Sequence, residues 1–229
     1  LNEFYRVDTV RIGAEGYFLT FDAGAFVGQR LPQDIVNPAD GAVLAKKGKK
    51  ITRALAKKIE EANITSLAVT EEDLLGRYFA HDVTDEKTGE VLAFCNSALT
   101  ADFLLKAAEA KINSFQLLYI DGVAYSESFR NTLQIDKVSG TDEALIEIYR
   151  RLRPSSPPTP EIAKTFFDTL FFSDASYDLS EVGRYKINTK LGLATPIEVR
   201  TLTKEDILKS VKHLVRIKDG LKEGDDIDH

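Results

Sequence analysis

The sequence has 229 residues, of which 43% are hydrophobic and 29% are charged, and its formal net charge is −6. This composition is typical of a folded protein and excludes a largely disordered chain. The acidic balance argues against a protein that coats nucleic acid with its whole surface, so any such contact is expected to be local. The apolar runs are short and no basic leader precedes one, so we expect no membrane span and a cytosolic type of protein.

Cysteine and histidine give no sign of a disulfide or a metal site. Cys95 is the single cysteine, and the three histidines, His81, His213 and His229, lie far apart in the sequence. We therefore expect an inert buried thiol, solvated histidines, no metal and no cofactor. The acidic stretch "DGLKEGDDID" at 219–228 resembles a calcium loop only superficially, because its spacing does not fit an EF-hand.

The first elements in chain order are a hairpin and a repeat. Residues 4–22 alternate between apolar and polar side chains and are predicted to turn near "GAEG". From residue 41 the sequence repeats at an offset of 48 residues, with segment 41–70 matching segment 89–118. Matched pairs include Gly41 with Gly89, Val43 with Val91, Thr52 with Thr100, Leu55 with Phe103 and Leu67 with Phe115. Each copy is predicted to form a short strand, a helix capped by its threonine, and a second strand.

Residues 74–94 between these helices are predicted to form a second hairpin that turns at "DEKTGE". From about residue 125 the pattern changes to helices separated by loops. The expected N-caps of four helices are Thr141, Thr159, Asp178 or Ser180, and Thr203. The predicted fold class is therefore α+β: a mixed α/β part with an internal two-fold repeat, residues 1–122, followed by a mostly helical part, residues 123–229.

Two clusters of cationic residues in the helical part have the chemistry of phosphate contacts. Arg150, Arg151 and Arg153 follow one another at a predicted helix end before a proline-rich loop, and guanidinium groups bind phosphate oxygens in a bidentate manner. The alternative for Arg150 and Arg151 is that their positive charges stabilise the helix C-terminus by a favourable interaction with the helix dipole. Arg153 is favoured as a contact because it is predicted to project from the loop.

The stretch "YDLSEVGRYKINTKLGL" at 177–193 forms the second cluster. Its apolar residues are expected to pack inward, while Arg184, Lys186 and Lys190 face nucleic acid or a neighbouring part of the protein. Alternatively, Arg184 pairs with Asp178 or Glu181. A third basic run, "KKGKKITRALAKK" at 46–58, is interpreted mainly as a solvated turn and helix face, with contact to a partner or DNA as the alternative.

Three strings together resemble one family. "EIYRRLRPSSPPT", "FFDTLFFSDASYDLSEVGRYKINTKL" and "DDIDH" occur in this order, and the sequence resembles the bacterial DNA-directed RNA polymerase β subunit over its whole length. Two departures from the family pattern are "RPSSPP" in place of a glycine-containing loop, and Ser176 where many relatives carry arginine.

The resemblance implies that residues 123–229 belong to the β2 lobe, which is one jaw of the downstream DNA channel. It also implies that residues 1–122 are a lineage-specific insertion, and that this chain is a piece without an active site of a larger nucleotidyltransferase. The implied partners are the subunits β′, α, ω and σ, downstream duplex DNA and the nontemplate strand, in the cytoplasm at the nucleoid.

The resemblance places Arg153 on the channel side, and we predict DNA contacts for Arg153, Arg150, Arg184 and Lys186. It also implies that "DDIDH" borders a pocket for an unstacked guanine of the nontemplate strand. There Asp228 would accept hydrogen bonds from the base and Ile227 would pack on it. The alternative function is a free-standing protein-interaction module with no role at DNA. A hydrolase is disfavoured because no arrangement of nucleophile and base is present.

Overall fold

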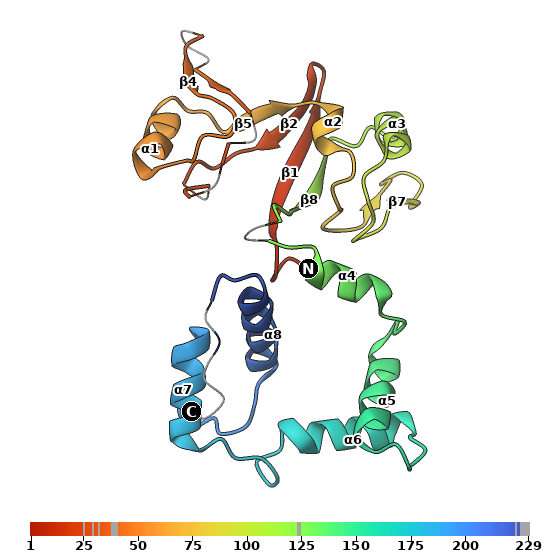
Figure 1. The fold of residues 1–229 in the computed structure, drawn as a ribbon. Coiled ribbons are helices and arrows are strands. Elements are labelled where there is room, and N and C mark those ends of the chain that lie inside the picture. The colour runs from red at the N-terminus through yellow and green to blue at the C-terminus, as the bar shows by residue number, and fades with distance from the viewer. Residues whose placement is uncertain are drawn as a thin grey trace. The chain divides into compact units, whose positions relative to one another are not determined.

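The computed structural model describes residues 1–24, 26–28, 30–31, 33–37, 41–122, 125–222 and 224 (Figure 1). It divides into two compact units, Leu1–Ile120 and Asp121–His229, which are called unit 1 and unit 2 below. Helices and small antiparallel sheets make up the described parts, which confirms the α+β class predicted from the sequence. Within those parts, no helix combines the length and the apolar character that a membrane span requires.

Unit 1 is built around a four-stranded antiparallel sheet with strand order β5-β2-β1-β8. Its members are β1 (Arg6–Gly13), β2 (Gly16–Thr20), β5 (Ser66–Val69) and β8 (Ser114–Tyr119). The predicted first hairpin is confirmed, because β1 pairs with β2 through the turn that Gly13 and Gly16 close. Gly16 has φ of +127°, a backbone conformation that side chains rarely adopt, so the turn needs glycine there.

Two short hairpins and three helices complete the part of unit 1 that the structure describes. β3 (Ile35–Val36) pairs with β4 (Val43–Ala45), and β6 (Val83–Thr84) pairs with β7 (Val91–Ala93). The second of these is the hairpin predicted to turn at "DEKTGE", and the Asp85 carboxylate accepts hydrogen bonds from Lys87 N and Thr88 Oγ1 in that turn. The helices are α1 (Arg53–Glu61), α2 (Glu71–Leu74) and α3 (Ala101–Glu109).

Equivalent hydrogen bonds occur 48 residues apart in unit 1. Helices α1 and α3 each have nine residues, and the hydroxyl of the preceding threonine accepts from a backbone N–H of the first turn at 3.3 Å in both. In each hairpin an aspartate Oδ1 accepts from a backbone N–H at 2.6 Å, from Lys47 to Asp34 and from Cys95 to Asp82. That segments 41–70 and 89–118 superpose as copies of one unit stays a prediction.

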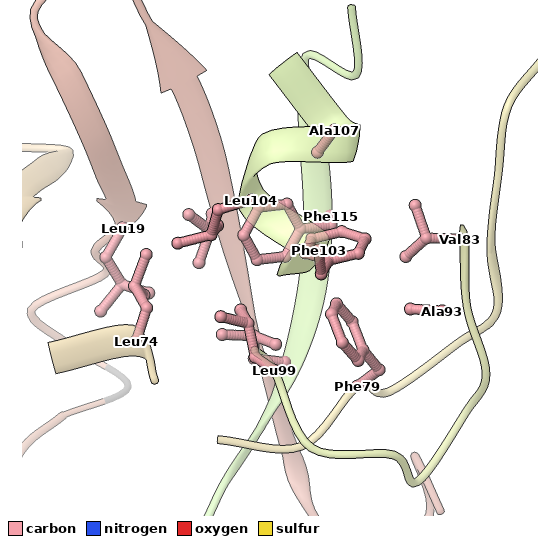
Figure 2. Close-up of a cluster of buried hydrophobic side chains, with 12 residues drawn as sticks. Leu19, Leu74, Phe79, Val83, Ala93, Leu99, Phe103, Leu104, Ala107 and Phe115 are labelled. Carbon is pink, nitrogen blue, oxygen red and sulfur yellow. The ribbon is translucent and has the colours of Figure 1, made fainter. Parts of the chain in front are cut away.

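The core of unit 1 consists of two clusters of buried apolar side chains. One lies between α3 and the strands β1 and β8 and includes the rings of Phe79, Phe103 and Phe115 (Figure 2). The centroid of the Phe103 ring is 4.6 Å from that of Phe79 and 5.3 Å from that of Phe115. The second cluster surrounds α1 and includes Leu55 and Ile59. Both helices therefore bury one apolar face against a sheet.

Unit 2 is helical in its described part. Its helices are α4 (Ser128–Ile135), α5 (Thr141–Leu152), α6 (Pro160–Phe171), α7 (Ser180–Leu191) and α8 (Lys204–Lys218). The predicted caps Thr159 and Thr203 are confirmed, since each hydroxyl accepts from a backbone N–H of the first turn. Near α7, the Asp178 carboxylate accepts from Ser180 N and the Ser180 hydroxyl from Gly183 N, while Leu179 holds the N-cap position.

The predicted N-cap of α5 is wrong. Gly140 occupies the N-cap position and Thr141 is the first helical residue. The Glu143 carboxylate instead reaches back to accept hydrogen bonds from the backbone N–H and the hydroxyl of Ser139, at 3.0 and 2.9 Å. These bonds fix the start of the helix one residue earlier than a threonine cap would. The same hydrogen bonds, the backbone one first, lower the pKa of Glu143.

Candidate nucleic-acid interface

Arg184 of α7 lies at the centre of the packing between α7 and α8. Its side chain is fully buried, and Nη1 donates to both carboxylate oxygens of Asp206, at 2.7 and 2.8 Å. Nε donates to the carbonyl oxygen of Val199 at 2.7 Å, and Nη2 donates to that of Thr201. The guanidinium group is thus neutralised and hydrogen-bonded inside unit 2, as a buried charge must be.

Asp206 connects this ion pair to the start of α8. Its carboxylate accepts from the backbone N–H and the hydroxyl of Thr203, at 2.7 and 2.9 Å, which completes a capping box. Burial opposes the ionised form of Asp206, but the hydrogen bonds from Arg184 and Thr203 outweigh this effect and lower its pKa. The Asp206 carboxylate therefore does two things: it caps the start of α8, and it joins α8 to α7 through Arg184.

This geometry corrects two sequence-based expectations for Arg184. It is not placed to contact nucleic acid, because its side chain is fully buried and its donors are occupied within unit 2. It also pairs with neither Asp178 nor Glu181. Asp178 instead forms an exposed ion pair with Arg200, whose Nε donates to Oδ1 at 2.8 Å. The capping box predicted at Thr203 and Asp206 is present, but it gives no signal for the pairing of Asp206 with Arg184.

Only some of the apolar residues of α7 pack inward as predicted: Ile187 and Leu191 are half-buried, whereas two others are exposed. Val182 and Tyr185 are 65% and 61% exposed, respectively. Lys186 is exposed on the same helix, where an ammonium group is accessible to a ligand. The one fully buried residue of α7 is therefore a charged one, Arg184, and not an apolar one.

The ends of α5 and α6 place the first arginine cluster at the surface. Arg150 and Arg151 are 63% and 80% exposed in their side chains, and both lie near the Glu147 carboxylate, at 3.9 and 3.3 Å. Such exposed pairs at helical spacing are weak. Both guanidinium groups therefore remain accessible to a stronger anionic ligand.

Arg153 differs from its neighbours because an aromatic ring positions it. It follows the last turn of α5, and its backbone N–H donates to the carbonyl oxygen of Tyr149 at 2.8 Å. The guanidinium carbon lies 4.8 Å from the centroid of the Phe166 ring of α6, a cation–π contact that leaves the edge of the group free to donate. The proline loop that follows ends at Thr159, the cap of α6. Arg153 is exposed beside this loop, and its contact with DNA stays a prediction.

Arg153 borders a hollow of about 380 Å³ between α5 and α6. The hollow also contains Glu161, whose carboxylate accepts a hydrogen bond from its own backbone N–H and another from Thr159, and both lower its pKa. An ionised carboxylate beside Arg153 weakens the local positive potential. Any phosphate contact of Arg153 is therefore expected at its solvent-exposed edge, away from Glu161.

The remaining sequence-based candidates have mixed outcomes. Ile227 and Asp228, the predicted base-reading residues, lie outside the described residues. The Ser176 hydroxyl donates to the carbonyl oxygen of Thr169 and holds the turn after α6. In unit 1, Lys46, Lys47, Lys49 and Lys50 are exposed, and Lys57 lies 4.0 Å from Glu61 in an exposed pair.

The expected burial of Cys95 is wrong. The residue is exposed, although its Sγ donates to the carbonyl oxygen of Ala80 at 3.2 Å, and partial burial raises the pKa of its thiol. His213 is half-buried rather than solvated. Within the part of the chain that the structure describes, no group of three or more histidine, cysteine or acidic residues is placed to hold a metal ion.

Comparisons with known proteins bear on both units. A family model described as "RNA polymerase Rpb2, domain 2" matches residues 118–229. The whole chain matches the DNA-directed RNA polymerase subunit beta of Desulfotalea psychrophila at 53% identity over 229 residues. This chain belongs to the DNA-directed RNA polymerase β-subunit family. The β subunit of Syntrophobacter fumaroxidans is 44% identical over 230 residues, and that of Desulfatibacillum aliphaticivorans is 43% identical over 229.

The chain spans about 17% of the length of these β subunits, and the alignment covers all of it in each case. Unit 2 corresponds to the region that the Rpb2 domain model matches, whereas unit 1 lies almost entirely outside that match. The exposed residues among the predicted contacts, Arg150, Arg153 and Lys186, all belong to the matched region.

Proposed function

We propose that this chain is a noncatalytic part of the RNA polymerase β subunit that forms one wall of the downstream DNA channel. In this assignment unit 2 is part of the β2 lobe and unit 1 is a lineage-specific insertion. The chain works within a DNA-templated nucleotidyltransferase at the nucleoid, together with the subunits β′, α, ω and σ. The observation that carries the proposal is the arginine cluster at the end of α5, exposed within the region that matches a polymerase domain.

The proposed contacts are electrostatic and independent of sequence. Arg153, positioned by the Phe166 ring, donates to phosphate oxygens, and Arg150 and Lys186 add further cationic contacts on exposed surfaces. Such contacts position a duplex without reading its bases. Arg184 is no longer one of the proposed contacts, because its guanidinium group is committed to Asp206.

The test uses polymerase assembled with this β sequence and the substitution Arg153→Ala. Loss of one phosphate contact is expected to shorten the lifetime of promoter complexes about equally on all templates. It should also lower the dependence of that lifetime on salt by roughly one counterion. The matched control is Arg200→Ala, which removes the same charge from unit 2 at an arginine that is paired with Asp178 and is not one of the proposed contacts.

An unchanged salt dependence for Arg153→Ala would overturn the phosphate contact and leave Arg153 as a residue that packs on Phe166. It would also favour the alternative, a protein-interaction module without a role at DNA. That alternative predicts that substitutions in unit 2 alter the binding of a protein partner and leave complexes with DNA unaffected.

We also propose, from the family resemblance, that Asp228 and Ile227 receive an unstacked guanine of the nontemplate strand. Asp228→Ala is expected to cost about 1–3 kcal/mol in promoter-complex stability only when guanine occupies that position. Two templates that differ at this single base provide the measurement. Equal losses on both templates would make Asp228 a structural carboxylate instead.

A further inference from the structure

The turn that joins β4 to α1, together with the first part of α1, carries seven basic residues (Figure 1). All of them are exposed, and the stretch that holds them, residues 46–58, is called the basic segment below. The seven residues are Lys46, Lys47, Lys49, Lys50, Arg53, Lys57 and Lys58. The sequence of the basic segment contains no acidic residue. A chain with a net charge of −6 thus concentrates seven cations on one short exposed stretch.

The acidic residues that contact the basic segment compensate little of its charge. Lys57 lies 4.0 Å from Glu61, in an exposed pair of the weak kind. Asp34 accepts a hydrogen bond from the backbone N–H of Lys47 at 2.6 Å, so it holds the turn rather than the ammonium group. The charge of Lys47 contributes less to the lowered pKa of Asp73 than the hydrogen bonds of that carboxyl do. The basic segment therefore keeps most of its positive charge exposed to solvent.

The turn at 46–49 has the same hydrogen bonds as the turn at 94–97. In each turn the N–H of the fourth residue donates to the carbonyl oxygen of the first at 3.1 Å. The third residue has a positive φ in both, +79° for Gly48 and +67° for Asn96. An aspartate Oδ1 accepts from the backbone N–H of the second residue at 2.6 Å in both. The two turns are therefore built in the same way.

The two turns differ in charge. Four of the five residues at 46–50 are lysines, whereas residues 94–98, "FCNSA", carry no charge. Because the same turn forms from uncharged residues, its fold does not need the lysines. Neighbouring like charges repel each other, so the lysines lower the stability of the turn rather than raise it. They require an explanation outside the fold of unit 1.

The start of α1 gives a second, independent observation. Arg53 is the first residue of the helix, and the first turn of α1 contains no acidic residue. A cation at this end opposes the helix dipole, which favours anions there. In α3, by contrast, Ala101 is the first residue and Asp102 follows it. Arg53 and Lys57 are four residues apart and add the repulsion of like charges. The charges of α1 therefore cost helix stability, which an anionic partner would offset.

The side chains of the basic segment fit a nucleic-acid backbone better than a protein surface. Lysine is depleted in protein–protein interfaces, whose centres are built from aromatic residues, methionine and arginine. The basic segment includes no exposed large hydrophobic residue. Single-stranded nucleic acid is bound largely by stacking on aromatic rings, and the segment has no aromatic residue. Exposed ammonium groups alone match the phosphates of a duplex.

We propose that the basic segment is a DNA contact of unit 1, in which Lys46, Lys47, Lys49 and Lys50 donate to backbone phosphates of duplex DNA. Each ammonium group forms charge-assisted hydrogen bonds with phosphate oxygens and displaces a condensed counterion. The contacts are independent of base sequence, because phosphates carry no sequence information. This contact is additional to those proposed for unit 2, and it rests on the proposed function in one respect, that the chain works at DNA.

The first test measures how fast individual lysines react with an acetylating reagent in polymerase assembled with this β sequence. Mass spectrometry compares the four lysines of the turn with Lys87 and Lys111, which are exposed lysines of unit 1 outside the basic segment. The enzyme is labelled alone and with a long duplex promoter fragment, without nucleotides, so that no transcript is present. At a DNA concentration ten times Kd, occupancy alone slows the reaction of a covered lysine about tenfold.

Protection of the four turn lysines by DNA, with Lys87 and Lys111 unprotected, supports the proposal. The proposal is overturned if DNA leaves the turn lysines unprotected, or if it protects Lys87 and Lys111 equally. Slow labelling already in the free enzyme, unchanged by DNA, also overturns it, because a protein neighbour within the polymerase would then cover the segment.

Double variants separate phosphate contacts from net charge. Lys49→Gln with Lys50→Gln is expected to make the slope of log Kobs for promoter DNA against log salt concentration shallower by about 1.8, or about 0.9 for each lost contact. Lys87→Gln with Lys111→Gln removes the same charge from unit 1 and is expected to leave the slope unchanged. Lys49→Arg with Lys50→Arg keeps the charge and should retain the original slope. If both glutamine variants act alike, or if the arginine variant loses the slope as well, the proposal is overturned.

The outcomes for the two units are separable. Arg153→Ala tests unit 2 and the lysine variants test unit 1, in the same enzyme and on the same DNA. An effect of Arg153→Ala alone overturns this inference and leaves the proposed function standing. An effect of the lysine variants alone places a DNA contact in unit 1 and removes the one proposed for Arg153 in unit 2.

Discussion

Units 1 and 2 bury different kinds of residues. Among the described residues, 26 of the 28 buried hydrophobic side chains belong to unit 1, and unit 2 contributes only Tyr149 and Ala163. The most deeply buried large side chain of unit 2 is a charged one, Arg184. Of the 19 large hydrophobic residues that are exposed in the described ranges, 13 lie in unit 2. Unit 1 is thus held by an apolar core of its own, whereas unit 2 depends on a buried ion pair and caps.

The difference in buried residues between the two units agrees with the family match, which covers unit 2 and almost none of unit 1. Unit 2 matches a polymerase domain, and this chain spans about 17% of its relatives. We expect the exposed apolar faces of α4 to α8 to contact other parts of the β subunit. Unit 1 is the proposed insertion. An insertion is not packed into the core of the domain that carries it, so it needs an apolar core of its own. Four predictions test this comparison, in order of decreasing expected effect.

Phe103→Ala should be the most damaging change in unit 1. The substitution removes a ring that contacts Phe79 and Phe115 and leaves a cavity, at a cost of about 3–5 kcal/mol. Urea unfolding of the chain, monitored by hydrogen exchange in each unit, measures the loss. The control is Leu105→Ala on the same helix, where the side chain is 68% exposed and the expected change is within about 0.5 kcal/mol. Equal effects would show that the aromatic cluster is not the core of unit 1.

Asp206→Asn should destabilise unit 2 while leaving unit 1 unchanged. Removing the carboxylate charge leaves Arg184 buried without its counter-ion, which typically costs about 3–5 kcal/mol. Hydrogen exchange of α7 and α8 amides is the measurement. Asp178→Asn serves as the control, because that pair with Arg200 is exposed and is expected to contribute about 0–1 kcal/mol. If both variants exchange alike, the buried pair does not hold unit 2.

Acid should weaken unit 2 before unit 1. Hydrogen bonds to ionised carboxylates lower the pKa of more acidic residues in unit 2 than in unit 1. In unit 2 these residues are Glu143, Glu161, Asp178 and Asp206, and in unit 1 they are Asp73 and Asp85. A lowered folded pKa contributes stability that is complete above the unfolded value, about 4. That contribution is lost as pH falls through the folded value. Exchange rates compared between pH 6 and pH 3 should therefore rise more in α5 to α8 than in β1 and β8. The opposite order would contradict the comparison.

Leu214→Gln should have the smallest effect in this chain. The side chain is 63% exposed on α8, so the expected change in unfolding free energy is within about 0.5 kcal/mol. In the complete β subunit the same substitution should cost more, if another part of the subunit covers this face. A comparison of the two proteins by thermal unfolding measures the difference. Equal, small effects in both would show that the face stays exposed to water.

The sequence by itself predicted the elements whose signals are local. The hairpin turn at Gly13–Gly16 and the threonine caps before α1, α3, α6 and α8 follow from turn and cap chemistry that acts over three or four residues. The family was also recognisable, because its strings lie in continuous stretches. The cap of α5 was missed because Ser139 and Glu143 formed the competing bond.

The site depended on contacts between residues distant in the sequence. Arg184 and Asp206 are 22 residues apart, and only the packing of α7 against α8 turned a predicted surface arginine into a buried one. The same packing left Val182 and Tyr185 exposed and brought Lys190 beside Lys212 and His213 in one groove. Helical periodicity specifies which residues share a face, but not which face is covered. Tertiary structure decided that, because a charge can be buried wherever a distant partner neutralises it.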